Sequence, residues 1–513
     1  MNLFSYDLIT QTWIPALALD GHERRLGLLD LLAEAHTLQD LTTPAPVVKA
    51  SLYRLLLALL GRIFQPQDAA GWTALQSAGA FDRGHLEAYF SAWSPRFDLF
   101  HPERPFFQAP DRRVKPKKLL KMVPHLASGN NPTLFDHSTE KVGITLTPAE
   151  AALYLVALQY FGLGGLSGIE EKFTNAPTGK GVNFFVQGEN LFESLLLNLH
   201  PAYHNELHGI PSLDPALDRP CWEMEDPFDP RPIPYGWFDY LTWQNRRVLL
   251  FPEEQEGTVV VRCMTEAPGL RLREDFINGN TVRDPYHYYR KASTGLLPLR
   301  FTEDRAVWRD SAALLGMDPD AAGLLPPPSL AWLQILARRH KLWPGKRYQV
   351  QALGLASDKA KALFYGDERL PLPLEFLLDP DCVDALKVAL GRAESAAKGL
   401  RWAVACMAEV IASFDWERNN QKPDPRQVEA LRNHLRADRV YWSELENDFH
   451  ALVERIPSGR EAALQTWNEL LVRVAWRAFE HSQALAGEDA RAQKAAVRGR
   501  AALGASLNKV FHH

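Results

Sequence analysis

The chain has 513 residues, 46% of them hydrophobic and 23% charged, which is ordinary for a globular protein. At about 150 residues per domain, this length predicts roughly two to four domains with sizeable cores. The formal net charge of −5 excludes a protein that coats nucleic acid through bulk charge. Any contact with nucleic acid is therefore expected to be local, or to be made within a larger complex.

The sequence shows neither a membrane-spanning pattern nor a cysteine framework. It has no run of about 20 apolar residues and no signal-peptide pattern. Four cysteines lie far apart, without the CxxC spacing of a zinc site: Cys221, Cys263, Cys382 and Cys406. We therefore expect a cytoplasmic protein with reduced thiols, no metal and no cofactor.

In chain order, residues 1–44 predict short strands and a helix near Gly27–Ala35, and Pro46 begins a strong helix that continues to Phe64. Proline-rich loops follow, and then the densest positive charge of the chain: Arg112, Arg113, Lys115, Lys117, Lys118 and Lys121. Two interpretations of this basic run stay open. It is either a solvated surface run or a patch that faces phosphates and gains affinity from counterion release.

Residues 147–168 predict a capped, buried helix that ends in a glycine loop. Thr147 is the expected N-cap, Pro148 the first helical residue, and Glu150 completes a capping box. The body of the helix, as far as Phe161, is apolar on nearly every face. We expect Gly162 to take a positive φ at its C-terminus. The loop itself has the sequence Gly162-Leu163-Gly164-Gly165-Leu166-Ser167-Gly168.

This glycine loop matches none of the enzyme motifs that use such a loop. A dinucleotide fingerprint requires glycine at Ser167, and a nucleophile elbow around Ser167 requires glycine at Ile169. A phosphate-binding loop ending in Gly179-Lys180 requires glycine at Thr174. What remains is either a backbone that approaches a partner closely because it lacks Cβ atoms, or an ordinary helix end with a tight turn.

Beyond the loop we expect a strand and a leucine-rich helix from Val182 to His200, and a strand over Tyr240–Pro252. Three histidines recur every four residues: His200, His204 and His208. This is metal-ligand spacing on a helix, but Pro201 argues against a regular helix, and we expect no metal there.

From Asp379 onward the pattern predicts long helices with short connections: Asp381–Phe414, Arg426–Ala437, Trp442–Ile456, Gly459–Ala484 and Glu488–Ala505. Such a series is typical of an antiparallel bundle. Its tryptophans Trp402, Trp467 and Trp476 serve either as core or as a docking surface. The expected fold class is therefore α+β. A large mixed α/β N-terminal domain spans residues 1–375, and a C-terminal antiparallel helical (four-helix) bundle spans 376–513.

Four local sequences carry a resemblance to a known family. They are Leu8-Ile9-Thr10-Gln11-Thr12-Trp13-Ile14-Pro15, the glycine loop with Lys180-Gly181-Val182-Asn183-Phe184-Phe185-Val186-Gln187-Gly188, Tyr240-Leu241-Thr242-Trp243-Gln244-Asn245-Arg246-Arg247, and Gly354-Leu355-Ala356-Ser357-Asp358-Lys359-Ala360-Lys361. With these in order, the chain resembles the CasA family, the large subunit of the type I-E CRISPR Cascade complex. The resemblance covers essentially the whole chain.

The resemblance implies that the chain reads a short protospacer-adjacent motif (PAM) in duplex DNA before a guide RNA pairs. In the family a glycine loop enters the minor groove, which is narrow and is suited to small backbone-led probes. By resemblance, Gly162, Gly164 and Gly165 fall on this loop.

A second, longer loop of the family carries a Phe, and an Asn two residues later, near the motif and the crRNA 5′ handle. The matching positions here are Phe135 and His137, so a histidine replaces the family's asparagine. Asn130 and Asn131 are nearby amides that could substitute for it.

A third element of the family is a turn that inserts a wedge side chain beside the motif. The matching turn here is Asp358, Lys359 and Ala360, with Lys359 at the wedge. The alternative from the residues alone is a helix N-terminus capped by Ser357. The family also uses a further lysine on the motif; no lysine matches it here, and Arg271 and Arg273 are candidates.

The implied partners are the backbone and small subunits of Cascade, the crRNA 5′ handle, target double-stranded DNA and a CRISPR helicase–nuclease, with no membrane. The expected function is non-enzymatic: PAM recognition, a start to strand opening for R-loop formation, and recruitment of the nuclease in antiviral defence. Two alternatives stay open. One is a structural adaptor that never reads DNA, and the other is a stand-alone nucleotide-binding hydrolase.

Overall fold

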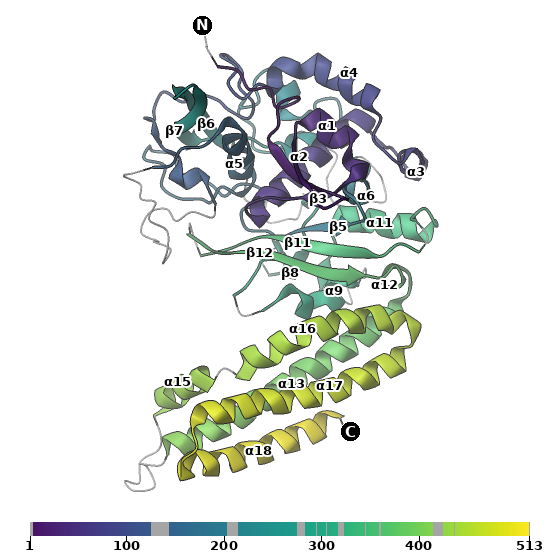
Figure 1. The fold of residues 1–513 in the computed structure, drawn as a ribbon, viewed down its shortest axis with the longest axis vertical. Coiled ribbons are helices and arrows are strands. Elements are labelled where there is room, and N and C mark those ends of the chain that lie inside the picture. Colours follow the sequence, from purple (N-terminus) through teal and green to yellow (C-terminus); the bar gives the residue numbers. More distant parts are fainter. Residues whose placement is uncertain are drawn as a thin grey trace. The chain divides into compact units, whose positions relative to one another are not determined.

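A computed structural model describes residues 4–124, 143–202, 214–273, 283–293, 295–303, 305–316, 323–343, 345–358, 361–413, 424–435 and 437–511. The chain forms two compact units (Figure 1). Unit 1 comprises Met1–Val307 and Met317–Arg369, and unit 2 comprises Trp308–Gly316 and Leu370–His513. In the described part of the chain, no helix is long and apolar enough to cross a membrane.

Unit 1 mixes helices with small sheets. Its α-helices are α1 Leu28–Ala33, α2 Pro46–Phe64, α3 Ala69–Ala78, α4 Arg83–Trp93, α5 Pro148–Phe161, α6 Leu191–Asn198, α7 Trp237–Leu241 and α11 Pro328–Arg338. The strand and helix expected between Val182 and His200 are confirmed as β5 and α6.

The sheets of the described residues are each three-stranded, in the orders β2-β1-β3, β10-β8-β9, β12-β11-β5 and β4-β7-β6. Their bounds are β1 Ile14–Ala18, β2 Glu23–Leu26, β3 Leu38–Leu41, β4 Lys117–Lys118, β5 Asn183–Gln187, β6 Arg246–Gln255, β7 Thr258–Pro268, β8 Tyr289–Ala292, β9 Gly295–Pro298, β10 Leu324–Leu325, β11 Tyr348–Asp358 and β12 Lys361–Leu372. Strand β11 runs antiparallel to β5, with Gln351 opposite Phe185. This pairing joins the Gly354–Lys361 sequence to the strand that follows the glycine loop.

A buried arginine holds the centre of unit 1 together. Arg54 of α2 is fully buried, and its Nη2 lies 2.9 Å from Oδ2 of Asp284. Its guanidinium group also faces the rings of Tyr160, Tyr240 and Tyr286 at 5.6, 5.7 and 5.6 Å. Because a buried charge is costly unless it is paired, these contacts tie α2 to α5, to α7 and to the segment before β8.

The strand expected over Tyr240–Pro252 is wrong in its first half. Residues Trp237–Leu241 form helix α7 instead, and β6 begins at Arg246. The cause lies some twenty residues earlier, where the Asp218 carboxylate accepts hydrogen bonds from the backbone N–H groups of Phe238 (3.2 Å) and Asp239 (2.9 Å). Asp218 thereby satisfies the first free N–H groups of a helix.

Unit 2 is helical. Its α-helices are α9 Ser311–Leu315, α12 Glu375–Leu378, α13 Pro380–Ala412, α15 Pro425–Leu435, α16 Ala437–Arg455, α17 Arg460–Ala486 and α18 Ala490–Phe511. The long helix α13 packs against α15, α16, α17 and α18 (Figure 1). Among the three tryptophans singled out above, Trp467 is buried, Trp476 is half-buried and Trp402 is exposed. The expected mixed α/β chain with a helical C-terminal region is therefore confirmed.

Candidate nucleic-acid interface

The glycine loop follows α5 as expected, but Gly162 does not take a positive φ. The capping box of Thr147 and Glu150 is present at the start of α5, and the body of the helix is buried. Gly162 has a φ of −54°, and its N–H continues the helical pattern by donating to the Leu158 carbonyl at 3.0 Å. The positive φ occurs at Gly168, +86°, where the loop turns. That prediction was wrong because the chain leaves the helix in an extended conformation and reverses only later.

The loop doubles back on itself to form two arms, an outgoing arm at residues 163–165 and a returning arm at residues 173–175. Gly165 and Phe173 form an isolated antiparallel bridge, with N···O distances of 3.1 and 2.9 Å. The Gly164 N–H donates to the side-chain oxygen of Asn175 at 2.9 Å. A Cβ on Gly164 would lie 3.1 Å from the Phe173 carbonyl, so the arms meet where a side chain would force them apart. Leu166, the residue after this bridge, is 86% exposed.

A buried arginine lies beneath both arms. Arg246, at the start of β6, is 1% exposed, and its Nη2 donates to the Leu163 carbonyl at 2.8 Å. Its Nη1 donates to the Thr174 carbonyl at 2.9 Å. The side chain of Gln159 holds the backbone of Arg246, accepting from its N–H (2.9 Å) and donating to its carbonyl (2.8 Å). Two of the family-like sequences, the glycine loop and Tyr240–Arg247, therefore meet at this arginine.

A carboxylate lies between Arg246 and the basic run. Glu266 Oε1 is 3.5 Å from Arg246 Nε, and Glu266 also forms an ion pair with Lys117. Burial lowers the pKa of Arg246 to about 10, while Glu266 opposes that shift. The arginine therefore stays charged at neutral pH. Both cations also face the ring of Phe173, at 4.6 Å for Arg246 and 5.8 Å for Lys117.

The basic run divides into paired and exposed cations. Arg113 bonds the carboxylates of Asp111 (2.7 Å) and Glu171 (2.6 Å), and Glu171 belongs to the returning part of the glycine loop. Lys117 is held by Glu266. The remaining members of the run are exposed: Arg112, Lys115, Lys118 and Lys121. The run therefore lies beside the loop, and it offers both anchoring cations and solvent-facing ones.

An open groove of about 900 Å³ lies along the returning arm of the loop. Its cationic lining comes from five separate places in the sequence: Arg113, Lys172, Arg231, Arg247 and Arg271. Arg247 faces the ring of Phe228 at 4.5 Å, whereas Arg231 is paired with buried Asp239 at 2.6 Å. Arg271 thus reaches the same groove as the loop, and the backbone N–H of Arg273 donates to Pro232 at 3.1 Å.

The hairpin of β11 and β12 joins the same region. A Cβ on Gly354 of β11 would lie 3.1 Å from the Gly181 carbonyl, so this glycine allows a close approach to the segment after the loop. The Tyr365 hydroxyl of β12 donates to the Pro124 carbonyl at 2.5 Å. Strand β11 runs through Ser357, so the alternative of a helix capped by that residue is wrong.

Several predicted site residues lie outside the described residues. They are Asn130, Asn131, Phe135 and His137 of the longer loop, and Lys359 and Ala360 of the turn. For Asp358 only the backbone is described, as the last residue of β11. The described residues at the two ends of the longer loop are nevertheless anchored. Pro124 is held by Tyr365, and a Cβ on Gly143 would lie 2.9 Å from the Lys118 side chain.

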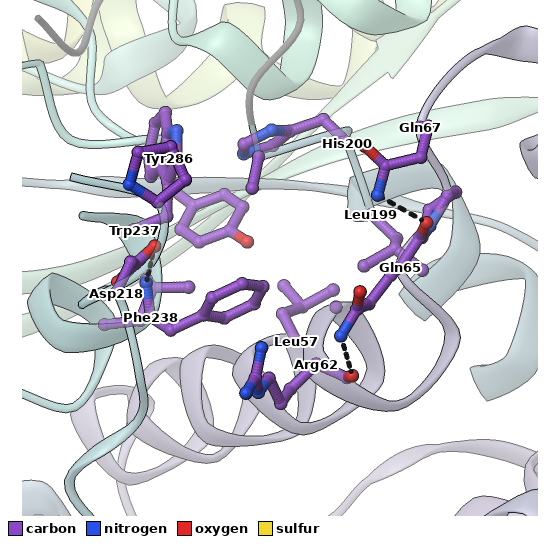
Figure 2. A pocket seen from close by; sticks show the side chains of 15 residues that line it. Leu57, Arg62, Gln65, Gln67, Leu199, His200, Asp218, Trp237, Phe238 and Tyr286 are labelled. Carbon is purple, nitrogen blue, oxygen red and sulfur yellow. Dashed lines mark hydrogen bonds between the residues drawn. The ribbon is translucent and has the colours of Figure 1, made fainter. Parts of the chain in front are cut away.

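A second, smaller pocket contains a histidine singled out by its spacing (Figure 2). His200 faces the ring of Trp237 at 4.8 Å and, with Phe238, lines a cavity of about 140 Å³. Burial lowers the pKa of His200 to about 4, so it is neutral at physiological pH. His204 and His208 lie outside the described residues, and within those residues no group of three side chains is suited to hold a metal.

The described fold is thus a mixed α/β unit, with a glycine loop beside a cationic groove, and a helical unit. The chain matches the family model for CRISPR-associated protein Cse1 over residues 7–478. CasA/Cse1 of Thermus thermophilus is 32% identical over 526 aligned residues, covering 99% of this chain and 98% of that protein. The chain belongs to the Cse1 (CasA) family, so the resemblance found in the sequence is confirmed.

Solved structures agree with this assignment. A crystal structure of Thermus thermophilus CasA matches with a TM-score of 0.80 and 30% identity, covering 99% of this chain and 100% of that one. A chain in a structure titled as a CRISPR RNA-guided surveillance complex matches with a TM-score of 0.74 and 26% identity, covering 98% and 99%.

The sequence did not reveal Arg246 and Glu266 as the residues under the glycine loop, or Tyr365 as the partner of Pro124. Arg246 was quoted as part of a family-like sequence, but nothing local marked it as buried. Its neighbours Gln244, Asn245 and Arg247 are themselves polar or charged, so the sequence around Arg246 carried no signal of burial.

Proposed function

We propose that this chain is the large subunit of a type I-E Cascade complex, where it recognises the PAM in duplex DNA and begins strand opening. Membership of the Cse1 family and the likeness to a chain of an RNA-guided surveillance complex support this proposal. In this function the chain is not an enzyme, and it needs no cofactor.

The observation that carries the proposal is the form of the glycine loop. Gly164 and Gly165 are half-buried where the arms meet, and the next residue, Leu166, is exposed. A minor groove is about 6 Å wide and presents few distinguishing groups, so a narrow probe of backbone with one apolar side chain suits it. Gly162, in contrast, is buried at the base, where a Cβ would lie 3.0 Å from Arg246 Nη2.

The cations around the loop would hold the phosphate backbone on either side of the motif. The exposed members of the basic run and Arg271 in the groove are the candidates: Arg112, Lys115, Lys118, Lys121 and Arg271. Phosphate contacts of this kind position a duplex without reading its sequence. Because these cations are concentrated near the loop, the chain could bind DNA there in spite of its net charge of −5.

The turn between β11 and β12 would start strand separation. Lys359, flanked by Asp358 and Ala360, would place its methylene stem against the first base step and its ammonium near a phosphate. Opening the first pairs costs a few kcal/mol, which contacts made only in the open state must offset. The loop of Phe135 and His137, with Asn130 and Asn131, would lie near the motif and the crRNA 5′ handle.

The helical unit would dock the chain among its partners. We propose that α13, α16, α17 and α18 form the expected four-helix bundle, with a domain boundary near residues 375 and 376. This unit would face the backbone and small subunits of Cascade. The assembled complex would then recruit the helicase–nuclease that cuts the target.

The test is target binding by the assembled complex with and without this chain, at one fixed salt concentration. Duplexes carry either the correct or a scrambled motif, and a single-stranded target serves as a reference that needs no opening. We expect the chain to be required for tight, motif-dependent binding of the duplex only. Full motif discrimination without the chain would establish the adaptor alternative, and nucleotide turnover by the chain alone would establish the hydrolase.

Two variants make this test residue-specific. Leu166→Ser removes an exposed side chain and is expected to weaken duplex binding by about tenfold, the equivalent of ~1.4 kcal/mol of apolar burial. Leu19→Ser is the matched control, because Leu19 is also exposed (56%) and follows strand β1. Lys359→Ala is expected to weaken duplex binding while single-strand pairing persists.

A further inference from the structure

We infer that Arg246 is a positioning residue for motif reading: it locks the two arms of the glycine loop into the one conformation that can enter the duplex. The inference rests on the proposed function and adds to it a buried determinant that does not itself touch DNA. Arg246 is buried beneath the loop, and its guanidinium group reaches main-chain atoms of both arms.

Arg246 bridges the two arms of the loop. One guanidinium group donates to the Leu163 carbonyl on the outgoing arm (2.8 Å) and to the Thr174 carbonyl on the returning arm (2.9 Å). These two carbonyls are separated by eleven residues, so the arginine closes the base of the loop as a cross-link would. Arginine does this through two nitrogens of one rigid plane, whereas lysine carries all its donors on a single nitrogen at the end of a flexible stem.

Gly162 leaves space for the guanidinium group of Arg246. A Cβ on Gly162 would lie 3.0 Å from Arg246 Nη2 and 3.1 Å from its Cζ. The glycine at the base of the loop therefore makes room for the guanidinium group. Glycine-rich segments are otherwise conformationally free, so a loop of this composition needs such a restraint before it can present a fixed shape.

The charges under the loop form one cluster. Arg246 and Lys117 share the single carboxylate of Glu266, and both cations face the ring of Phe173. Phe173 in turn pairs through its backbone with Gly165. The cluster therefore connects the basic run, strand β7 and the loop in one unit, and carries one net positive charge directly under the part that would meet a polyanion.

The experiment measures motif selectivity, the ratio of affinities for correct and scrambled duplexes, in the assembled complex carrying Arg246→Lys. Lysine keeps the charge but has only one nitrogen in place of the two that bond the Leu163 and Thr174 carbonyls. We expect the selectivity ratio to fall at least tenfold, while complex assembly and single-strand binding stay unchanged. Arg62→Lys is the matched control. Arg62 forms a bidentate ion pair with Glu223 (2.8 Å) and does not contact either arm of the loop.

Phe173→Leu is a second variant, in case Arg246→Lys prevents folding. Phe173 is half-buried, and this change removes the aromatic ring that faces the guanidinium group of Arg246. It is also expected to lower the selectivity ratio. If both variants retain the ratio of the Arg62→Lys control while omission of the chain abolishes selectivity, the inference is wrong and the proposed function stands. If omission of the chain also leaves selectivity intact, both are wrong.

Discussion

Two buried histidines make the stability of unit 1 dependent on pH. Burial lowers the pKa of His200 to about 4, and burial likewise lowers the pKa of His287 to about 4 against a smaller opposing effect of Asp284. The ordinary value is about 6.5, so the unfolded chain binds protons more readily between these two values. The stability that the two neutral histidines contribute is therefore fully present above about pH 6.5, and it is lost as the pH falls towards 4.

We expect the melting temperature to drop between about pH 7 and pH 5, with a contribution of up to ~2 kcal/mol from each histidine over this range. His200→Phe, which fits the aromatic contact with Trp237, should remove part of that drop. His22→Gln alters an exposed histidine and should leave it unchanged. A melting temperature that does not vary over this range would contradict buried, neutral histidines.

At the residue scale, the sequence predicted local contacts better than contacts between residues far apart in the chain. The capping box of Thr147 and Glu150 follows from a local pattern, and it was confirmed. The bond from Arg246 to Leu163 joins residues 83 positions apart, and the bond from Tyr365 to Pro124 joins residues 241 apart. No local pattern encodes such pairs, because they arise only when the chain is folded.

At the scale of elements, two glycines of α13 differ in what surrounds them. A Cβ on Gly399 would lie 2.7 Å from the Cβ of Ser506 in α18, whereas a Cβ on Gly391 would have nothing within 4 Å. Gly399 therefore permits the close packing of α13 and α18, while Gly391 only weakens the helix. Alanine at an exposed helical glycine gains roughly 0.5–1 kcal/mol.

Gly391→Ala is accordingly expected to raise the free energy of unfolding, and Gly399→Ala to lower it by about 1–3 kcal/mol through overpacking. Urea denaturation of the two variants measures the difference. Adding Ser506→Gly to Gly399→Ala should restore part of the loss. Equal effects of the two alanines would show that α13 and α18 do not approach each other this closely.

Long helices were the elements best predicted from sequence. The helix expected at Asp381–Phe414 spans Pro380–Ala412, and that expected at Gly459–Ala484 spans Arg460–Ala486, because apolar periodicity and end residues are local signals. The helix expected at Trp442 begins at Ala437 instead. Helix α7 was missed because its cap, Asp218, is distant in sequence.

At the scale of the whole molecule, the chain combines a negative net charge with a local concentration of cations. The formal charge is −5, yet the basic run, the Arg246 cluster and the groove gather positive side chains around one loop in unit 1. The resemblance to the family came from four ordered sequences spread over the chain, whereas the arrangement of the loop, groove and hairpin could be described only from the structure. We propose that this arrangement reads a duplex from its minor groove.

The most direct measurement replaces single groups on the motif of the target duplex and follows binding by the assembled complex. Inosine for guanine removes the minor-groove amino group, and 2,6-diaminopurine for adenine adds one, whereas 7-deazapurines alter only the major groove. The account predicts that a minor-groove change at one or more motif pairs shifts affinity by about tenfold, near the ~1.4 kcal/mol of a single contact. It also predicts that 7-deazapurines have little effect. Loss of binding with 7-deazapurines, and indifference to the minor-groove changes, would contradict the account.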